Sequence, residues 1–361
     1  MERRRFVAGT AITAGALAAC SRPPTAGPAV ASTQPIHWKM VTSWPANFPG
    51  LGAGAARLAE MIGKMSGGRL TVKVFGGGEL VPPFEVFDAV SQGTAEMGHS
   101  GAYYWKGKAE AAQFFCAVPF GMNAQEMNGW LYHGGGMELW RELYAKFNLV
   151  PFAAGNTGVQ CAGWFRKEIN SVADLQGLKM RIPGLGGEVL QRLGGSPVNI
   201  PGAELFTALQ TGAIDATEWV GPYNDLAFGL HTVAQHCYYP GWQEPGPTLE
   251  CMVNKTAFDA LPADLQAIVE AAARATNDDM LADYTTQNQR ALQTLESEHG
   301  ISLKPLPDDV IAALRSTSQA VIEEIAKKDD FTQRVYDSYR TYLEGAKRWH
   351  RVSEMAYYAA R

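Results

Sequence analysis

The sequence is poor in charge and in cysteine, and it has no long apolar run after its first thirty residues. Charged residues make up 19% of the 361 residues, with 31 Lys and Arg against 36 Asp and Glu. The formal net charge of -5 gives no general attraction to nucleic acid or to an anionic membrane surface. Five cysteines in so long a chain exclude a disulfide-built scaffold. Because a membrane-spanning helix needs about 20 apolar residues, we do not expect an integral membrane protein.

The usual catalytic and cofactor motifs are incomplete. The run GLGG at 184–187 begins like a dinucleotide-binding loop, but Val189 stands where the pattern GxGxxG needs its last glycine. The run GHSGA at 98–102 resembles a nucleophile elbow whose final glycine is replaced by alanine. One enzyme hypothesis remains, an exported hydrolase built around Ser100 and His99, and it lacks a visible acid/base constellation.

The first 31 residues predict export to the periplasm. Three arginines at 3–5 followed by Phe6 resemble the twin-arginine export signal, and the weakly apolar run behind them is too short to span a membrane. The run LAAC ending at Cys20 resembles a lipoprotein cleavage box, which would make Cys20 a lipidated first residue. The run AVA at 29–31 is a competing cleavage site that would release a soluble protein. Residues 21–34, rich in Pro, Ala and Ser, predict a tether.

Export permits disulfides among the cysteines that remain after Cys20. Four cysteines allow three pairings, and the sequence does not choose between them. No CxxC or Cys/His cluster occurs, so we expect neither a zinc nor a redox site. Buried, unpaired thiols are the favoured interpretation. The four residues are Cys116, Cys161, Cys237 and Cys251.

Strands alternate with helices in the first part of the mature chain. Residues 36–41, 69–75 and 95–98 have the character of strands, and residues 50–65 and 83–92 have the apolar periodicity of helices. This βαβα order predicts an α/β fold with a mainly parallel sheet.

A phrase from this region returns later in the chain. AVSQGTAE from Ala89 lines up with ALQTGAID from Ala208, and each reads as a helix end, a glycine stop and a short strand that bears an acid. The spacing of about 120 residues suits two α/β lobes of related construction.

The last hundred residues are predicted to be helical. Residues 262–300 contain no Gly or Pro between their ends, and about 38 residues of helix would span nearly 60 Å. Such a helix exceeds one small lobe, so we expect it to cross between lobes. Residues 308–361 continue as helix with an apolar stripe that packs either on the chain's own lobes or on a second copy. The stripe consists of Val335, Tyr339, Tyr342, Ala346 and Trp349.

Residues 155–247 hold the polar side chains best suited to a binding site. Residues 155–165 have the pattern of a continuous strand. Arg181 ends a second apolar strand, and its planar fork of donors matches a carboxylate, although an ordinary ion pair is the alternative. Glu218 and Trp219 follow a third strand, where they place an oxygen ligand beside an apolar wall.

These residues resemble the DctP-like solute-binding proteins of TRAP (tripartite ATP-independent periplasmic) transporters. The resemblance rests on phrases in the family's order and covers residues 36 to at least 300. The phrases are AVSQGTAEMG, LQGLKMRIPG, GGSPVNIP and AELFTALQTGAIDATEW.

The resemblance implies an α/β, two-lobed periplasmic-binding-protein fold with interleaved lobes, a long lobe-spanning helix and a helical C-terminal extension. Residues 1–31 would be the export signal and tether. Lobe 1 would comprise residues 36–155 plus about 240–285, and lobe 2 residues 156–239 plus about 286–310. Residues 311–361 would form a helical tail that can be swapped in a homodimer.

The resemblance also implies binding without catalysis. In the family the arginine matched by Arg181 grips the carboxylate of a small organic acid, which is delivered to the membrane subunits. A narrower branch binds 2-oxo or 2-hydroxy monocarboxylates such as pyruvate through a metal ion. Matching that branch, Gln160, the Glu218 carboxylate, the Trp219 carbonyl and Gln243 would hold the ion.

The chemistry of the acid agrees with this interpretation. A 2-oxo acid can chelate one cation through a carboxylate oxygen and its keto oxygen, which leaves the other carboxylate edge for Arg181. Since every proposed protein ligand is oxygen, a hard ion suits the site, with Na⁺ expected first and Ca²⁺ as the alternative. Asn156 and Tyr103 would donate hydrogen bonds to the acid. Three aromatic residues would wall its apolar end: Trp44, Trp219 and Phe228.

A metal-free site for another carboxylate, such as a dicarboxylate, an aromatic acid or a sugar acid, is the alternative within the same fold. A second basic residue beside Arg181 would favour it. Arg166 and Arg192 are the candidates, and both have the sequence context of surface charges.

Overall fold

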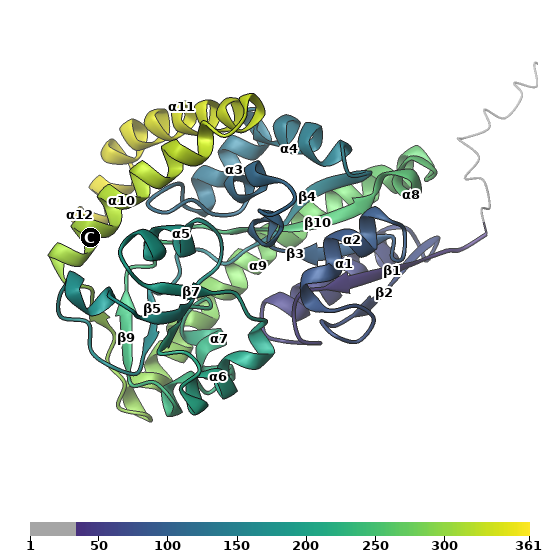
Figure 1. The fold of residues 1–361 in the computed structure, drawn as a ribbon. Helices are drawn as coiled ribbons and strands as arrows, with labels where there is room; N and C mark the ends of the chain where they lie inside the picture. Colours follow the sequence, from purple (N-terminus) through teal and green to yellow (C-terminus); the bar gives the residue numbers. More distant parts are fainter. Residues whose placement is uncertain (1–33) are drawn as a thin grey trace, which may run out of the picture. The chain divides into compact units, whose positions relative to one another are not determined.

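The strands form two mixed sheets in the computed structural model, which describes residues 34–361 (Figure 1). The first sheet has the order β2-β1-β3-β10-β4. In it β2, β1 and β3 run parallel, and β10 is antiparallel to both of its neighbours. Its strands are β1 (Ile36–Thr42), β2 (Leu70–Phe75), β3 (Met97–Ser100), β4 (Leu149–Asn156) and β10 (Thr248–Asn254).

The second sheet has the order β11-β9-β5-β8-β6-β7. Here β7, β6 and β8 run parallel and β5 is antiparallel to both of its neighbours, so β7-β6-β8-β5-β9 repeats the strand directions of the first sheet. Its strands are β5 (Gly163–Phe165), β6 (Lys179–Arg181), β7 (Ser196–Val198), β8 (Ala216–Thr217), β9 (His236–Tyr239) and β11 (Lys304–Pro305).

The repeated phrase adopts one backbone conformation in both sheets. Gly93 and Gly212 have φ of 79° and 75°, a left-handed conformation that glycine adopts without strain. The N–H of Ala95 donates to the Ala89 carbonyl at 3.3 Å, and that of Ile214 donates to Ala208 at 3.2 Å. Strands β3 and β8 each begin four residues after the glycine, so the predicted relation between the lobes is confirmed.

The chain crosses between the sheets at residues 157–162 and again at 240–247. The expected continuous strand over residues 155–165 is therefore wrong, since β4 and β5 belong to different sheets. Gly158 and Gly163 have φ of 71° and 131°, which interrupts the extended backbone between them.

Helices cover both sheets. Those of the first lobe are α1 (Leu51–Met65), η1 (Pro83–Glu85), α2 (Val86–Ser91), η2 (Ala102–Trp105), η3 (Glu110–Phe115), α3 (Ala124–His133), α4 (Gly136–Ala145) and α8 (Lys255–Asp259). Those of the second lobe are η4 (Val172–Leu175), α5 (Gly184–Arg192), η5 (Gly202–Glu204), α6 (Leu205–Thr211), α7 (Pro222–Ala227) and η6 (Leu230–Thr232). The two-lobed α/β architecture is as predicted, while the lobe limits to the residue stay a prediction.

The long helix α9 runs from Ala263 to Ser297 without a break. Its 35 residues extend over about 52 Å. It packs on α1 and β4 of the first lobe and on α7 of the second, as expected of a lobe-spanning helix (Figure 1).

The tail consists of α10 (Asp308–Ala326), α11 (Asp330–Val352) and α12 (Glu354–Ala360). Helix α10 packs on α5, and α11 packs on η3, α3 and α4. The apolar stripe divides along α11: Val335 and Tyr339 are buried, whereas Trp349 is 62% exposed. The first half of the stripe thus packs on the chain's own lobe, and the second half faces outward.

The four cysteines after Cys20 are free thiols, three of them buried and Cys161 half-buried, as the favoured interpretation predicted. Within residues 34–361, no helix is both long and apolar enough to cross a membrane. The predicted export signal and the cleavage sites at Cys20 and Ala31 lie outside the described residues.

Candidate functional site

Arg181 lies at the carboxyl end of β6 and is 1% exposed. Its guanidinium donates to the Glu218 side chain, to the Glu218 carbonyl at 3.2 Å and to the Tyr104 hydroxyl at 3.0 Å. Its Nε donates to the Ile200 carbonyl at 3.3 Å, and its charged end lies 4.9 Å from the ring centre of Trp219. Burial acts to lower the pKa of Arg181, but the Tyr104 phenol and the Glu218 carboxylate outweigh it, so the guanidinium stays charged.

Glu218 is held beside Arg181 by the sheet. Strands β6 and β8 are parallel with Arg181 opposite Thr217, and Glu218 is the next residue. Its side chain is fully buried, and burial raises its pKa to about 7, although Arg181 and Gln243 act to lower it. Its Oε2 has no hydrogen-bond partner among the described residues.

The two crossovers bring the predicted glutamine ligands to the same place. The Gln160 N–H donates to the Glu244 carbonyl at 3.2 Å, and the Gly241 N–H donates to the Gln160 carbonyl at 2.9 Å. The Gln243 amide donates to the Cys161 carbonyl at 2.9 Å. In this part of the chain both side-chain oxygens, Gln160 Oε1 and Gln243 Oε1, are buried and lack a hydrogen bond.

Glu244 completes this group, and sequence reasoning missed it. Its Oε2 accepts a hydrogen bond from the Gln160 side-chain amide at 2.9 Å, and it is 3% exposed. Burial raises the pKa of Glu244 well above its usual value, and the nearby Glu218 carboxylate adds to this effect. The sequence signal that could have found it is its position directly after Gln243 in a Pro- and Gly-rich loop, where an acid is not explained as part of an exposed helix face.

Aromatic side chains from both lobes close the site. Trp44 and Trp219 meet edge to face at 6.2 Å between ring centres, and Phe228 lies 5.3 Å from Trp219. Phe48, which the sequence did not single out, stacks on Phe228 at 4.2 Å. A cavity of about 10 Å³, room for about one water molecule, lies among Trp44, Tyr103, Tyr104, Gln160 and Trp219. The lobes are thus closed onto each other in this structure.

The two predicted hydrogen-bond donors, Tyr103 and Asn156, differ in whether other protein groups already occupy them. Tyr103 lines the cavity, but its neighbour Tyr104 makes the bond to Arg181. Asn156 uses its amide group on the Gly246 carbonyl at 3.0 Å and on Thr248, and its oxygen accepts from the Gly158 N–H at 2.9 Å. Asn156 therefore holds the first crossover, and its donor role toward an acid stays a prediction.

The donor set fits a hard cation. Gln160, Glu218 and Gln243 each offer a buried oxygen without a partner, and in the described residues the Trp219 carbonyl accepts no backbone hydrogen bond. Buried oxygens are normally paired, so several unpaired ones at one site indicate a ligand. Residues 34–361 contain no cluster of three or more His, Cys, Asp and Glu suited to a metal, and three of the four candidate oxygens at this site belong to amides or a carbonyl.

The alternatives find less support in the geometry. Arg192 pairs with Glu324 on α10, and Arg166 lies exposed beside Gly212, so neither adds a second cation at Arg181. His99 Nδ1 accepts from the Trp44 indole at 2.8 Å and its Nε2 lies 3.2 Å from the Ala154 carbonyl. The ring therefore has no nitrogen for Ser100, whose hydroxyl bonds to Ser43 at 2.6 Å.

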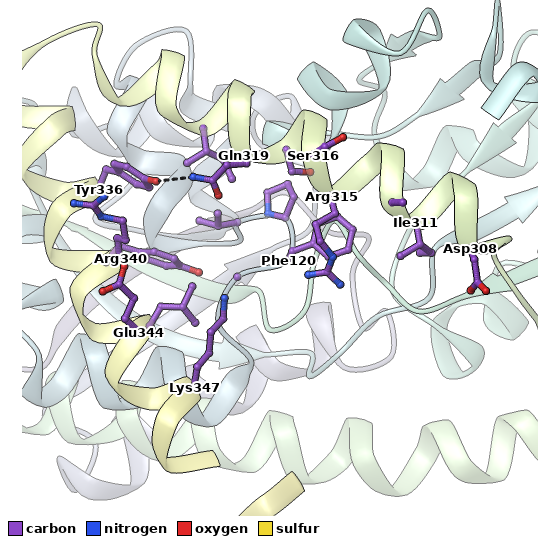
Figure 2. Close-up of a pocket in the computed structure, with 18 residues that line it drawn as sticks. Phe120, Asp308, Ile311, Arg315, Ser316, Gln319, Tyr336, Arg340, Glu344 and Lys347 are labelled. Carbon is purple, nitrogen blue, oxygen red and sulfur yellow. Dashed lines mark hydrogen bonds between the residues drawn. The ribbon is translucent and has the colours of Figure 1, made fainter. Parts of the chain in front are cut away.

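A second cavity, larger than the one beside Arg181, lies elsewhere. It measures about 760 Å³ and lies between α10, α11 and the loop at 118–121, and none of the predicted site residues lines it. Figure 2 shows side chains of both signs around it, with Arg315 over the Phe120 ring, Lys347 on α11 and Asp308 at the start of α10.

Two interleaved lobes closed over a buried arginine and a group of unpaired oxygens define a solute-binding protein. A family model agrees over most of the chain. Residues 40–329 match the bacterial extracellular solute-binding protein family 7, and the chain belongs to this family.

Its relatives include proteins of known ligand. The chain is 44% identical to a monocarboxylate 2-oxoacid-binding periplasmic protein of Nostoc sp., over 99% of this chain and 98% of the relative. A TRAP periplasmic solute-binding protein of Pseudoalteromonas atlantica, solved with sodium and pyruvate, is 45% identical with a TM-score of 0.88, covering 91% of this chain and all of that one. A protein of Colwellia psychrerythraea, solved with calcium and pyruvate, is 42% identical with a TM-score of 0.88 and the same coverage.

Proposed function

We propose that this chain is the periplasmic solute-binding component of a TRAP transporter that captures a pyruvate-like 2-oxo or 2-hydroxy monocarboxylate and delivers it to membrane subunits. The observation that carries the proposal is the meeting of the charged Arg181 with three buried, unpartnered side-chain oxygens. The similar proteins solved with pyruvate and sodium or calcium support it.

In the proposed complex Arg181 binds the carboxylate of the acid. A bound cation would supply positive charge to the keto or hydroxyl oxygen and to one carboxylate oxygen of the acid. Gln160, Glu218, the Trp219 carbonyl and Gln243 are the residues that would hold it. Arg181 and the ion together offset the cost of burying an anion.

The aromatic wall of the proposed site comes from both lobes. Trp44 comes from the first lobe and Trp219 from the second, so an acid between them contacts both lobes only when these are closed. Closure then follows from the difference in affinity between the two states. Tyr103 and Asn156 complete the proposed contacts.

Calorimetric titration tests the proposal directly. We expect pyruvate, 2-oxobutyrate or a longer 2-oxo acid to bind with a Kd below about 100 µM, which corresponds to about 5.5 kcal/mol. Dialysis into a buffer free of Na⁺ and Ca²⁺ should weaken binding strongly, and returning either ion should restore it. Failure of every 2-oxo acid, with binding of a dicarboxylate or sugar acid instead, would show that the substrate class is wrong.

We also propose that residues 1–31 direct export. Mass spectrometry of the mature N-terminus in a Gram-negative host distinguishes the two processing sites. A lipidated Cys20 and a soluble chain starting after Ala31 differ in mass and in partition into detergent. An uncleaved chain left in the cytoplasm would contradict the export proposal.

We propose, finally, that the end of the tail mediates a homodimer. Trp349, Val352, Met355, Tyr357 and Tyr358 are each more than 60% exposed, an apolar group that a second copy would cover. Sedimentation of the full chain should give a dimer, and truncation after Ser353 should give more monomer. A monomeric full chain at micromolar concentration would refute this.

A further inference from the structure

Glu244 is the acid at the site that the proposed ligand set does not use. It lies on the second crossover, and its Oε2 accepts from the Gln160 side-chain amide at 2.9 Å. The backbones of the two crossovers are joined at the same point, because Gln160 N–H donates to the Glu244 carbonyl at 3.2 Å. Gln160 and Glu244 are therefore held together by both main chain and side chain.

This contact fixes which way the Gln160 amide faces. An amide presents its oxygen and its NH₂ group on opposite edges. With the NH₂ group donating to Glu244 and to the Thr157 hydroxyl at 3.2 Å, the oxygen is turned away from both. That oxygen is the buried Gln160 Oε1 that lacks a partner. Without an acceptor at position 244, the amide could rotate and present NH₂ to a cation, which repels it.

Glu244 also changes the number of acids at the site. Glu218 and Glu244 are both buried, and the Glu244 side chain reaches the proposed metal ligand Gln160 through its hydrogen bond to the Gln160 amide. The proposed site therefore holds two protein carboxyl groups, to which a bound acid would add its own carboxylate. Ca²⁺ affinity rises with the number of charged groups around the ion, and a second acid favours the divalent ion.

We infer that Glu244 is a positioning and selectivity residue: it orients the Gln160 oxygen toward the bound cation and shifts the preference of the site from Na⁺ toward Ca²⁺. The inference rests on the proposed function, in which Gln160 is a metal ligand. Sequence alone offered one protein carboxylate and hence favoured Na⁺; the second carboxyl group is what the structure adds.

Two substitutions separate orientation from charge. Glu244→Gln keeps an oxygen that can accept from the Gln160 amide but removes the acid. Glu244→Leu removes both. Calorimetry on the full chain would measure the affinity for Ca²⁺ and for Na⁺, with and without pyruvate, and circular dichroism would confirm that each variant is folded.

We expect Glu244→Gln to weaken Ca²⁺ binding by about 10- to 100-fold while Na⁺ binding changes by less than about threefold. Glu244→Leu should weaken both ions. An unchanged ratio of Ca²⁺ to Na⁺ affinity in Glu244→Gln would overturn the inference, and so would a wild-type chain that binds neither ion. If the wild type binds Ca²⁺ with these responses but binds no 2-oxo acid, the proposed function fails and the inference stands.

Discussion

The two lobes share one strand arrangement but carry different residues where the matched strands end. We call these places the first end, in the first lobe, and the second end, in the second lobe. In the first lobe Val41 on β1 lies opposite Gly98 on β3, and His99 follows. In the second lobe Arg181 on β6 lies opposite Thr217 on β8, and Glu218 follows. Gly98 and Thr217 each lie five residues after the matched glycines, Gly93 and Gly212. His99 therefore corresponds to Glu218, and Val41 corresponds to Arg181 through the strand pairing.

The two ends differ in whether their polar atoms are satisfied. Burial lowers the pKa of His99 to about 4, so the ring is neutral, and both of its nitrogens have partners in the protein. Glu218 is equally buried, but one of its oxygens has no partner among the described residues. The first end thus stabilises the fold, whereas the second keeps polar atoms available for a ligand.

Among these substitutions, removing Arg181 at the second end should cause the largest loss of affinity for the acid. Arg181→Ala deletes the cation that would pair with the acid's carboxylate, so we expect pyruvate affinity to fall by about 1,000-fold, in line with loss of a buried charge partner. Arg181→Lys keeps a charge without the planar fork and should give an intermediate loss. Calorimetry measures both, and normal binding by Arg181→Ala would remove the arginine from the site.

Substitution of the matched residues should separate stability from binding. His99→Ala leaves the Trp44 indole N–H and the Ala154 carbonyl unpaired, so we expect about 2–4 kcal/mol of lost stability. Glu218→Gln should abolish the metal dependence of acid binding, and it should also cost stability because the buried Arg181 charge loses its carboxylate partner. Urea unfolding and calorimetry of both variants provide the comparison. The distinction between the lobes fails if His99→Ala removes the metal dependence or if Glu218→Gln leaves it unchanged.

Much of this fold could be predicted because local patterns determine it. The glycine stops at 93 and 212, the uninterrupted helix α9 and the Arg181 strand end all follow from residue types in fixed order. The crossovers at 157–162 and 240–247 could not, since hydrophobic alternation does not say which sheet a strand joins. Glu244 was missed for the same reason: its partner Gln160 lies 84 residues away, and only the pairing of the crossovers joins them.

Acid should destabilise the protein through His99. The folded pKa of about 4 lies below the usual 6.5, so between these values the unfolded chain binds more protons than the folded one. This contribution is complete above pH 6.5 and is lost as the pH falls toward 4, by up to about 3 kcal/mol. We expect the stability difference between the wild type and His99→Gln to shrink over that range, measured by urea unfolding at several pH values. A constant difference would contradict a neutral buried ring.

Substitution of Ser100 should have the smallest effect on stability, and it tests whether the first end has a structural or a catalytic role. Ser100 follows His99 as Trp219 follows Glu218, and its hydroxyl bonds only to Ser43 among the described side chains. Because Ser43 keeps its bond to the Pro83 carbonyl at 2.7 Å, Ser100→Ala should cost about 1 kcal/mol. Pyruvate affinity should not change, and ester substrates should be hydrolysed no faster than in buffer by either chain. An esterase activity of the wild type that Ser100→Ala abolishes would make the first end catalytic and reverse the contrast between the lobes.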